Sequence, residues 1–194
     1  MPEGDNDSLK EEFTLLVRPH EGVLLAGALR FAGNRADAED LLQETYMKAY
    51  VGFKRSQAVE NPRAWLFKIM RNAYINRYHK KKREPAGVPY EEALDYKVDE
   101  LASRRMDPER QFFSQLLDSE VEEALNSIPE QFKESVILCD VSGLTYEEIS
   151  QVLDCPLGTV RSRISRGREL LFEKLYDYAK ERGLLPKGEK GNAG

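Results

Sequence analysis

Residues 144–171 read LTYEEISQVLDCPLGTVRSRISRGRELL and carry the signals of two consecutive helices. Thr145 and Glu148 have the spacing of a capping box, so we expect the first helix to begin there. The break at residues 154–156 ends this helix, and Pro156 suits the start of the next one. Apolar residues then recur on one face of the second helix at Leu157, Val160, Ile164, Gly167 and Leu171. The stretch therefore predicts a helix-turn-helix.

The remaining faces of the second helix are polar and basic. Four Arg and no acidic residue lie between residues 157 and 168. An Arg side chain binds phosphate or takes a guanine edge with two hydrogen bonds, and Ser or Thr contacts phosphates. A plain solvated face is the alternative. We expect the helix to bind duplex DNA, and the helix alone leaves open which Arg reads bases.

A second basic segment lies upstream, where residues 61–83 read NPRAWLFKIMRNAYINRYHKKKR. Residues 62–83 contain eight Lys or Arg and no Asp or Glu, although the whole chain has a net charge of −5. Asn61 followed by Pro62 predicts a helix start. Aromatic side chains alternate with the charges, so this helix offers both phosphate contacts and faces for stacking bases.

After the basic segment, residues 84–106 are acidic and lack helical periodicity. Pro85, Gly87 and Pro89 interrupt any helix that continues from the basic segment. We therefore predict an all-α fold of two small helical domains, residues 8–84 and 107–183. A flexible acidic linker at residues 85–106 joins them, and residues 184–194 form a disordered tail.

The sequence argues against several other classes of protein. Cys139 and Cys155 have no partners at metal-site spacing, and His20 and His79 lie far apart. We expect free thiols, no metal, no cofactor and no catalytic nucleophile with a base. No stretch has the roughly 18 consecutive apolar residues that span a bilayer. The acidic N-terminus lacks the order of a secretory signal, so we expect a cytoplasmic protein without a membrane role.

The motifs together resemble the extracytoplasmic-function (ECF) sigma factors of bacterial RNA polymerase. The resemblance rests on DAEDLLQETYMKAYVGF at residues 37–53, on residues 61–83 and on residues 143–171. It covers nearly all of residues 10–175. The pieces KAYVGF and NAYINRYHKKKREP are most similar to the sigma-R/sigma-H group, which answers thiol-oxidative stress through a zinc-containing anti-sigma factor. The resemblance implies that such a partner senses the redox change and holds this chain inactive.

The resemblance also implies how the chain meets polymerase. Residues 37–53 match the helix that docks on the clamp helices of the β′ subunit, and the C-terminal domain would meet the β flap. The implied clamp contacts are Asp40, Gln43, Glu44 and Lys48. Asp40, Glu44 and Lys48 lie four apart on one helical face, and a simple supporting salt bridge between Glu44 and Lys48 is the alternative.

The basic segment matches the region that opens and reads the promoter −10 element. The loop at residues 54–61 would capture a flipped base. The implied DNA contacts are Asn61, Arg63, Phe67, Lys68, Arg71, Asn72, Tyr74, Asn76, Arg77, Lys80 and Lys81. We place the stripe of Phe67, Arg71, Tyr74 and Tyr78 toward the separated strand, and the stripe of Leu66, Ile69 and Ala73 inward. Trp65 is expected to pack in the core, and residues 80–83 to hold duplex phosphates.

The helix-turn-helix matches the domain that reads the −35 element, usually a GGAA-type sequence in this family. Guanines suit Arg, so the implied contacts are Thr159, Arg161, Ser162, Arg163, Ser165 and Arg166. The linker would run toward the RNA exit path. The chain itself would have no enzymatic activity and would direct transcription initiation by the polymerase. A stand-alone helix-turn-helix regulator is one alternative, and it leaves the helix at residues 37–53 unexplained. An enzyme acting on nucleic acid is another, but it needs clustered carboxylates or His near the basic surface, and residues 62–83 contain no carboxylate.

Overall fold

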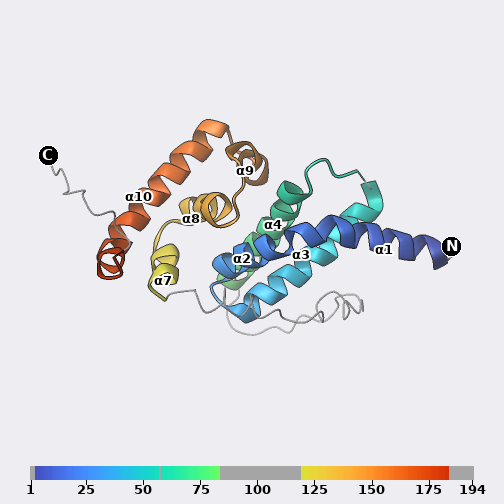
Figure 1. Cartoon of the computed structure of the whole chain (residues 1–194), viewed down its shortest axis with the longest axis horizontal. Coiled ribbons are helices and arrows are strands. Elements are labelled where there is room, and N and C mark those ends of the chain that lie inside the picture. Colours follow the sequence, from blue (N-terminus) through green and yellow to red (C-terminus); the bar gives the residue numbers. More distant parts are fainter. Residues whose placement is uncertain (1–2, 57, 84–118, 184–194) are drawn as a thin grey trace.

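The computed structural model describes residues 3–56, 58–83 and 119–183, and this part of the chain is helical without strands (Figure 1). The predicted all-α fold is confirmed. The N-terminal module, residues 3–83, contains α1 (Glu3–Val17), η1 (Arg18–His20), α2 (Glu21–Ala32), α3 (Arg35–Ser56) and α4 (Pro62–Arg83). The C-terminal module, residues 119–183, contains α7 (Ser119–Ser127), α8 (Glu130–Val136), η2 (Ile137–Val141), α9 (Tyr146–Leu153) and α10 (Leu157–Glu181). The predicted linker and tail lie outside the described residues.

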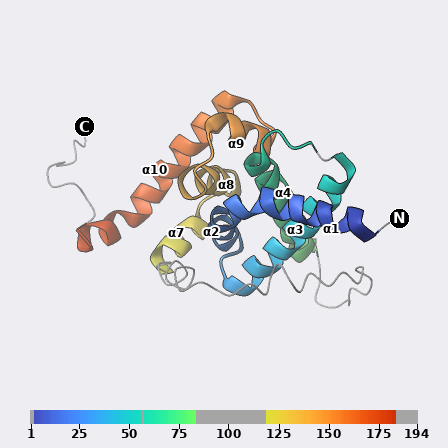
Figure 2. The ribbon, with the colours of Figure 1, turned by 45° about the vertical axis from the view of Figure 1, so that its right-hand side comes forward.

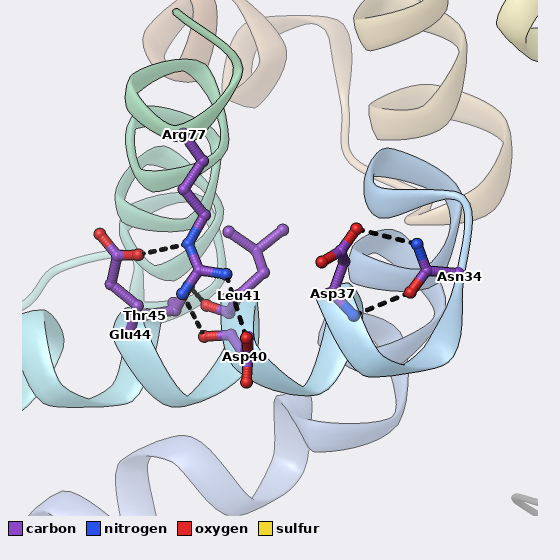
Figure 3. A network of polar contacts seen from close by, with 7 residues as sticks. All are labelled: Asn34, Asp37, Asp40, Leu41, Glu44, Thr45 and Arg77. Carbon is purple, nitrogen blue, oxygen red and sulfur yellow. Dashed lines mark hydrogen bonds and ion pairs between the residues drawn. The ribbon is translucent and has the colours of Figure 1, made fainter. Parts of the chain in front are cut away.

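Short polar side chains begin the two long helices of the N-terminal module. The backbone N–H of Asp37 donates to Asn34 Oδ1 at 2.9 Å, and Asn34 Nδ2 donates to Asp37 Oδ2 at 2.8 Å (Figure 3). Asn61 Oδ1 accepts from the backbone N–H of Ala64 at 3.1 Å, as expected for a residue that precedes α4. The helix start predicted at Asn61 is therefore confirmed, and Asn34 and Asp37 begin α3 in a similar way.

The helix-turn-helix forms as its sequence predicts. The hydroxyl of Thr145 accepts from the backbone N–H of Glu148, and Glu148 Oε2 accepts from the backbone N–H of Thr145. Asp154 ends α9 in the left-handed region, with φ of 51°. The buried apolar residues of the two helices are Ile149, Val152, Leu153, Val160 and Ile164. The Arg-rich faces of α10 consequently point away from this core.

The segment after Pro129 is not a regular α-helix throughout. It begins as α8 but widens at η2, where the backbone N–H of Ser142 donates to the carbonyl of Ile137, five residues earlier, at 2.9 Å. Gly143 then ends the segment with φ of 62°. The widened turn moves Ser142 against α2. A Cβ atom on Gly27 would lie 3.2 Å from Ser142 Oγ.

The two modules pack against each other through α4, α2, α9 and η2 (Figures 1 and 2). Helix α4 contacts α2 and α3 of its own module and α9 of the other. Buried residues of both modules form one continuous apolar cluster. No helix among residues 3–56, 58–83 and 119–183 is long and apolar enough to cross a membrane.

Candidate nucleic-acid interface

The first candidate surface is the Arg-rich face of α10. Arg161, Ser162, Ser165 and Arg166 are exposed, while Thr159 and Arg163 are partly buried. Arg166 Nη1 pairs with Glu169 Oε2 at 2.5 Å, and Arg163 Nη1 donates to Cys155 Sγ at 3.8 Å. Within the described part of the chain, Arg161 has neither an ion pair nor a hydrogen bond from its side chain. Its guanidinium is therefore available to a ligand.

Arg168 lies on the same helix but has a different environment. Its Nε and Nη2 donate to the two carboxylate oxygens of Asp140 at 3.0 and 2.5 Å. The hydrogen bonds that Arg168 donates to the Asp140 carboxylate raise the pKa of Arg168. This pair joins α10 to η2, so Arg168 supports the fold of the C-terminal module.

The second candidate surface is α4, and part of this helix is exposed to solvent. Lys68, Asn72 and Asn76 lie four residues apart on one exposed stripe. None of the three has a hydrogen bond or ion pair to another described residue. This stripe presents one ammonium group and two amides to solvent. It suits phosphate contacts and base edges.

Other predicted DNA contacts on α4 meet the C-terminal module instead. Asn61 Nδ2 donates to Glu148 Oε1 at 2.8 Å, and Arg63 Nη2 donates to the carbonyl oxygen of Ser142. Arg71 Nε and Nη2 both donate to Glu134 Oε2, at 3.2 and 3.1 Å. The Tyr74 ring lies 6.0 Å from Lys133 Nζ. Arg63, Arg71 and Tyr74 of α4, and Asn61 directly before it, therefore lie where the other module covers the helix.

The prediction that Phe67 contacts the separated strand is wrong. Its side chain is 0% exposed. A Cβ atom on Gly27 would lie 2.8 Å from Phe67 Cε1, so Phe67 packs tightly against α2. The physical reason is that α4 is covered on more than one side, which buries residues outside a single apolar stripe. Tyr74 is only partly buried and lies against Phe31, with 5.1 Å between ring centroids.

The residues of α4 that were predicted to face inward are buried or partly buried in the structure. Leu66 and Ala73 are fully buried and Ile69 is partly buried. Trp65 packs against the core, and its Cζ2 would lie 3.2 Å from a Cβ atom on Gly52. The side chains of Tyr78, Lys80 and Lys81 lie outside the described residues, so their predicted roles remain predictions.

The third candidate surface is the face of α3 that carries Asp40, Gln43, Glu44 and Lys48. Lys48 Nζ pairs with Glu44 Oε1 at 2.6 Å, and this is the supporting ion pair that the sequence left as an alternative. Arg77 of α4 also donates from Nε to Glu44 Oε2 at 2.6 Å and from Nη2 to the Asp40 carbonyl at 3.0 Å (Figure 3). Gln43 is exposed and has no hydrogen bond from its side chain to a described residue.

The Arg77 contacts were not foreseen, because a link between residues 33 positions apart has no local signal. Burial acts to raise the pKa of Glu44, but the hydrogen bonds from Lys48 and Arg77 outweigh it and the net pKa is lowered. Glu44 is therefore held as a carboxylate. It joins the predicted polymerase contacts on α3 to a predicted DNA contact on α4.

Comparison with known proteins shows the family of the chain. Residues 16–84 match the model of Sigma-70 region 2, and residues 118–171 match the model of Sigma-70 region 4. The ECF RNA polymerase sigma-E factor of Haemophilus influenzae is 33% identical over 168 residues, which cover 86% of this chain and 88% of the relative. The chain belongs to the ECF RNA polymerase sigma factors.

Two further comparisons agree with this membership. ECF RNA polymerase sigma factor SigE of Mycolicibacterium smegmatis is 36% identical over 86% of this chain, and the chain spans 62% of the length of that relative. The crystal structure of the sigma factor RpoE in complex with the anti-sigma factor NepR, from Bartonella quintana, superposes with a TM-score of 0.61. It is 29% identical and covers 87% of this chain and 97% of that chain.

The described part of this sigma factor contains no group of three or more His, Cys, Asp or Glu arranged to hold a metal ion. Cys139 and Cys155 are free and partly buried. Burial and the neighbouring Asp140 raise the pKa of the Cys139 thiol, so it is less readily ionised than an ordinary cysteine.

Proposed function

We propose that this sigma factor binds core RNA polymerase and directs transcription initiation by recognising −10 and −35 promoter elements. The observation that carries the proposal is that one chain presents three separate surfaces. They are the exposed Arg face of a capped helix-turn-helix, the exposed stripe of α4 and the face of α3 around Gln43. A stand-alone helix-turn-helix regulator needs the first surface alone.

In this proposal α10 reads the −35 element from the major groove. Residues near the start of a recognition helix reach the base edges. Arg161 lies one turn into α10 and is exposed, so it is suited to a guanine. Ser162, Ser165 and the partly buried Thr159 would contact the DNA backbone beside it. Arg163 and Arg166 would first give up their contacts with Cys155 and Glu169.

Helix α4 would bind the −10 region. Lys68, Asn72 and Asn76 are open to the strand, whereas Asn61, Arg63, Arg71 and Tyr74 would join them once the C-terminal module moves away. Arg77 would take part from its position beside Glu44, and Lys80 and Lys81 would hold phosphates at the end of the helix. Binding of the unpaired strand would supply the free energy for melting, because each stacked base is worth about 1–3 kcal/mol.

Regulation by a partner protein belongs to the same proposal. The Bartonella quintana structure contains a sigma factor with an anti-sigma factor. We extend that arrangement to this chain and propose an anti-sigma factor that restrains it during growth without stress. The sigma-R/sigma-H resemblance adds a zinc-containing partner and a thiol-stress regulon. The chain would act in the cytoplasm, where it meets the polymerase, and would leave phosphodiester chemistry to that enzyme.

Replacing Gln43 tests the polymerase surface cleanly, because Gln43 is exposed and holds no other described side chain. We expect Gln43→Ala to weaken binding to core polymerase by about tenfold, equivalent to about 1.4 kcal/mol. Glu44→Ala is less suitable because it would also release Lys48 and Arg77. Binding is measured by fluorescence anisotropy of the labelled full chain titrated with core enzyme.

Gln151→Ala is the matched control, since Gln151 is exposed on α9 of the other module. It should bind core enzyme as the parent does. Parent-like affinity of Gln43→Ala would remove the assignment of α3 to the clamp helices. Failure of the parent itself to bind core enzyme would favour the stand-alone regulator.

A further inference from the structure

We infer that the C-terminal module of the free protein occupies the −10 surface of α4 and competes with promoter DNA for it. The inference rests on the proposed function, since it takes α4 as the −10 surface. It adds an internal regulator that acts without any second protein. The contacts that carry it join Asn61, Arg63 and Arg71 to groups of the C-terminal module.

The ion pair between Arg71 and Glu134 is the most buried of these contacts. The side chain of Arg71 is 20% exposed and that of Glu134 is 5% exposed. Two guanidinium nitrogens donate to one carboxylate oxygen, which is an arrangement that Arg also forms with phosphate. Glu134 therefore occupies the donors of Arg71 that a promoter strand would use.

Two further contacts repeat this chemistry along the start of α4. The carboxylate of Glu148 accepts from Asn61, and the carbonyl of Ser142 accepts from Arg63. In each contact an oxygen of the C-terminal module accepts from a donor of the N-terminal module. Phosphates and base edges are acceptors of the same kind. The covering face thus presents hydrogen-bond acceptors to the same donors that a promoter strand would use.

The interface also contains polar groups that remain unsatisfied. Arg63 Nε, Glu134 Oε1 and Ser142 Oγ are buried and have no hydrogen-bond partner among the described residues. Burial raises the pKa of Glu134 even though Arg71 acts in the opposite direction. Unsatisfied buried polar groups destabilise the closed arrangement. This is the property expected of a contact that opens when a better ligand arrives.

The packing of the C-terminal module on α4 covers one of the two proposed DNA-binding surfaces and leaves the other exposed. Arg161, Ser162 and Ser165 on α10 stay exposed while the face of α4 that carries Arg71 is covered. The free protein should accordingly bind duplex DNA through α10 and bind an unpaired strand only after it opens. If a small fraction of molecules is open, the apparent dissociation constant for the strand is the intrinsic constant divided by that fraction.

The test weakens the contact between Arg71 and Glu134 by changing Glu134, which is not a proposed DNA contact. Glu134→Gln keeps the size of the side chain and removes its charge, and leaves every proposed DNA contact intact. The probe is a fluorescent mixed-sequence single-stranded DNA of about 16 nucleotides. We expect Glu134→Gln to bind it about tenfold more tightly than the parent in anisotropy titrations. Small-angle X-ray scattering of the free protein should show a larger radius of gyration.

Glu173→Gln is the matched control, because Glu173 is exposed on α10 and the substitution changes the net charge equally. It should behave as the parent in both measurements. Glu148→Gln is the second opening variant if Glu134→Gln does not fold, since Gln also serves in a capping box. Glu148→Gln should likewise raise the affinity for the strand and the radius of gyration. Parent-like strand affinity and radius of gyration in a folded opening variant would overturn the inference.

The outcome is separable from that of the proposed function. Promoter-dependent transcription with core polymerase, together with unchanged strand binding in Glu134→Gln, would leave the function standing and remove the internal competition. Tighter strand binding by Glu134→Gln without any polymerase-dependent transcript would support the internal competition and remove the proposed function.

Discussion

Arg161 and Arg168 lie about two turns apart on α10, yet their side chains have opposite surroundings. Arg161 is exposed and makes no side-chain hydrogen bond or ion pair to a described residue, whereas Arg168 makes two hydrogen bonds to Asp140. A guanidinium that is already bound to a carboxylate is less available to a guanine. We therefore assign ligand binding to Arg161 and structural support of the module to Arg168.

The two residues should respond differently to truncation. Arg161→Ala should weaken binding to a GGAA-type duplex by about 1–3 kcal/mol, roughly 5-fold to 150-fold, without changing the melting temperature. Arg168→Ala should lower the melting temperature, because it leaves Asp140 without its partner on α10. The measurements are anisotropy with the labelled duplex and thermal unfolding followed by circular dichroism. Equal duplex affinity of parent and Arg161→Ala would contradict the assignment.

At the scale of elements, the crossing of α8 and α10 depends on a small residue. A Cβ atom on Gly167 would lie 2.6 Å from Val136 Cγ2 and 3.2 Å from the carbonyl oxygen of Phe132. The backbone oxygen belongs to α8 and does not move aside as the end of a flexible side chain would. The close approach lets α10 pack on α8 while its basic face remains outside.

Gly167→Ala should therefore destabilise the protein. Overpacking costs about 1–3 kcal/mol, and the gain in helix propensity is about 1 kcal/mol, so the free energy of unfolding should fall by about 1 kcal/mol. The measurement is urea unfolding. Gly158→Ala is the control on the same helix, because a Cβ atom there meets nothing within 4 Å, and it should not destabilise the protein. A loss as large in Gly158→Ala would show that the crossing is not the cause.

The elements also show what the sequence alone could predict. The capping box at Thr145 and the Asn caps of α3 and α4 act over three residues, so local sequence identifies them. The burial of Phe67 depends on its packing against α2, which is separate from α4 in sequence. The Arg77 link to Glu44 likewise joins two helices that are separate in sequence. The widened turn at η2 carries no sequence signal that we recognise. The burial of Phe67 and the Arg77–Glu44 contact were not predicted because both depend on packing between helices that are distant in sequence.

At the scale of the whole molecule, the two modules form one structure rather than two separate units. One apolar cluster extends across both, and Arg71 joins Glu134 within the interface. The sequence predicted both modules and the chemistry of each surface. It did not predict which surfaces face each other, because that depends on shape and charge across the interface. The arrangement leaves α10 accessible and partly covers α4, which is the expected resting state of a protein that reads DNA together with polymerase.

The most direct test of the central claim is run-off transcription with core RNA polymerase on a promoter that carries a GGAA-type −35 element. The account predicts a discrete transcript that requires this sigma factor and that is strongly reduced by Arg161→Ala and by Gln43→Ala. Binding of the protein to the duplex without any polymerase-dependent transcript would contradict it.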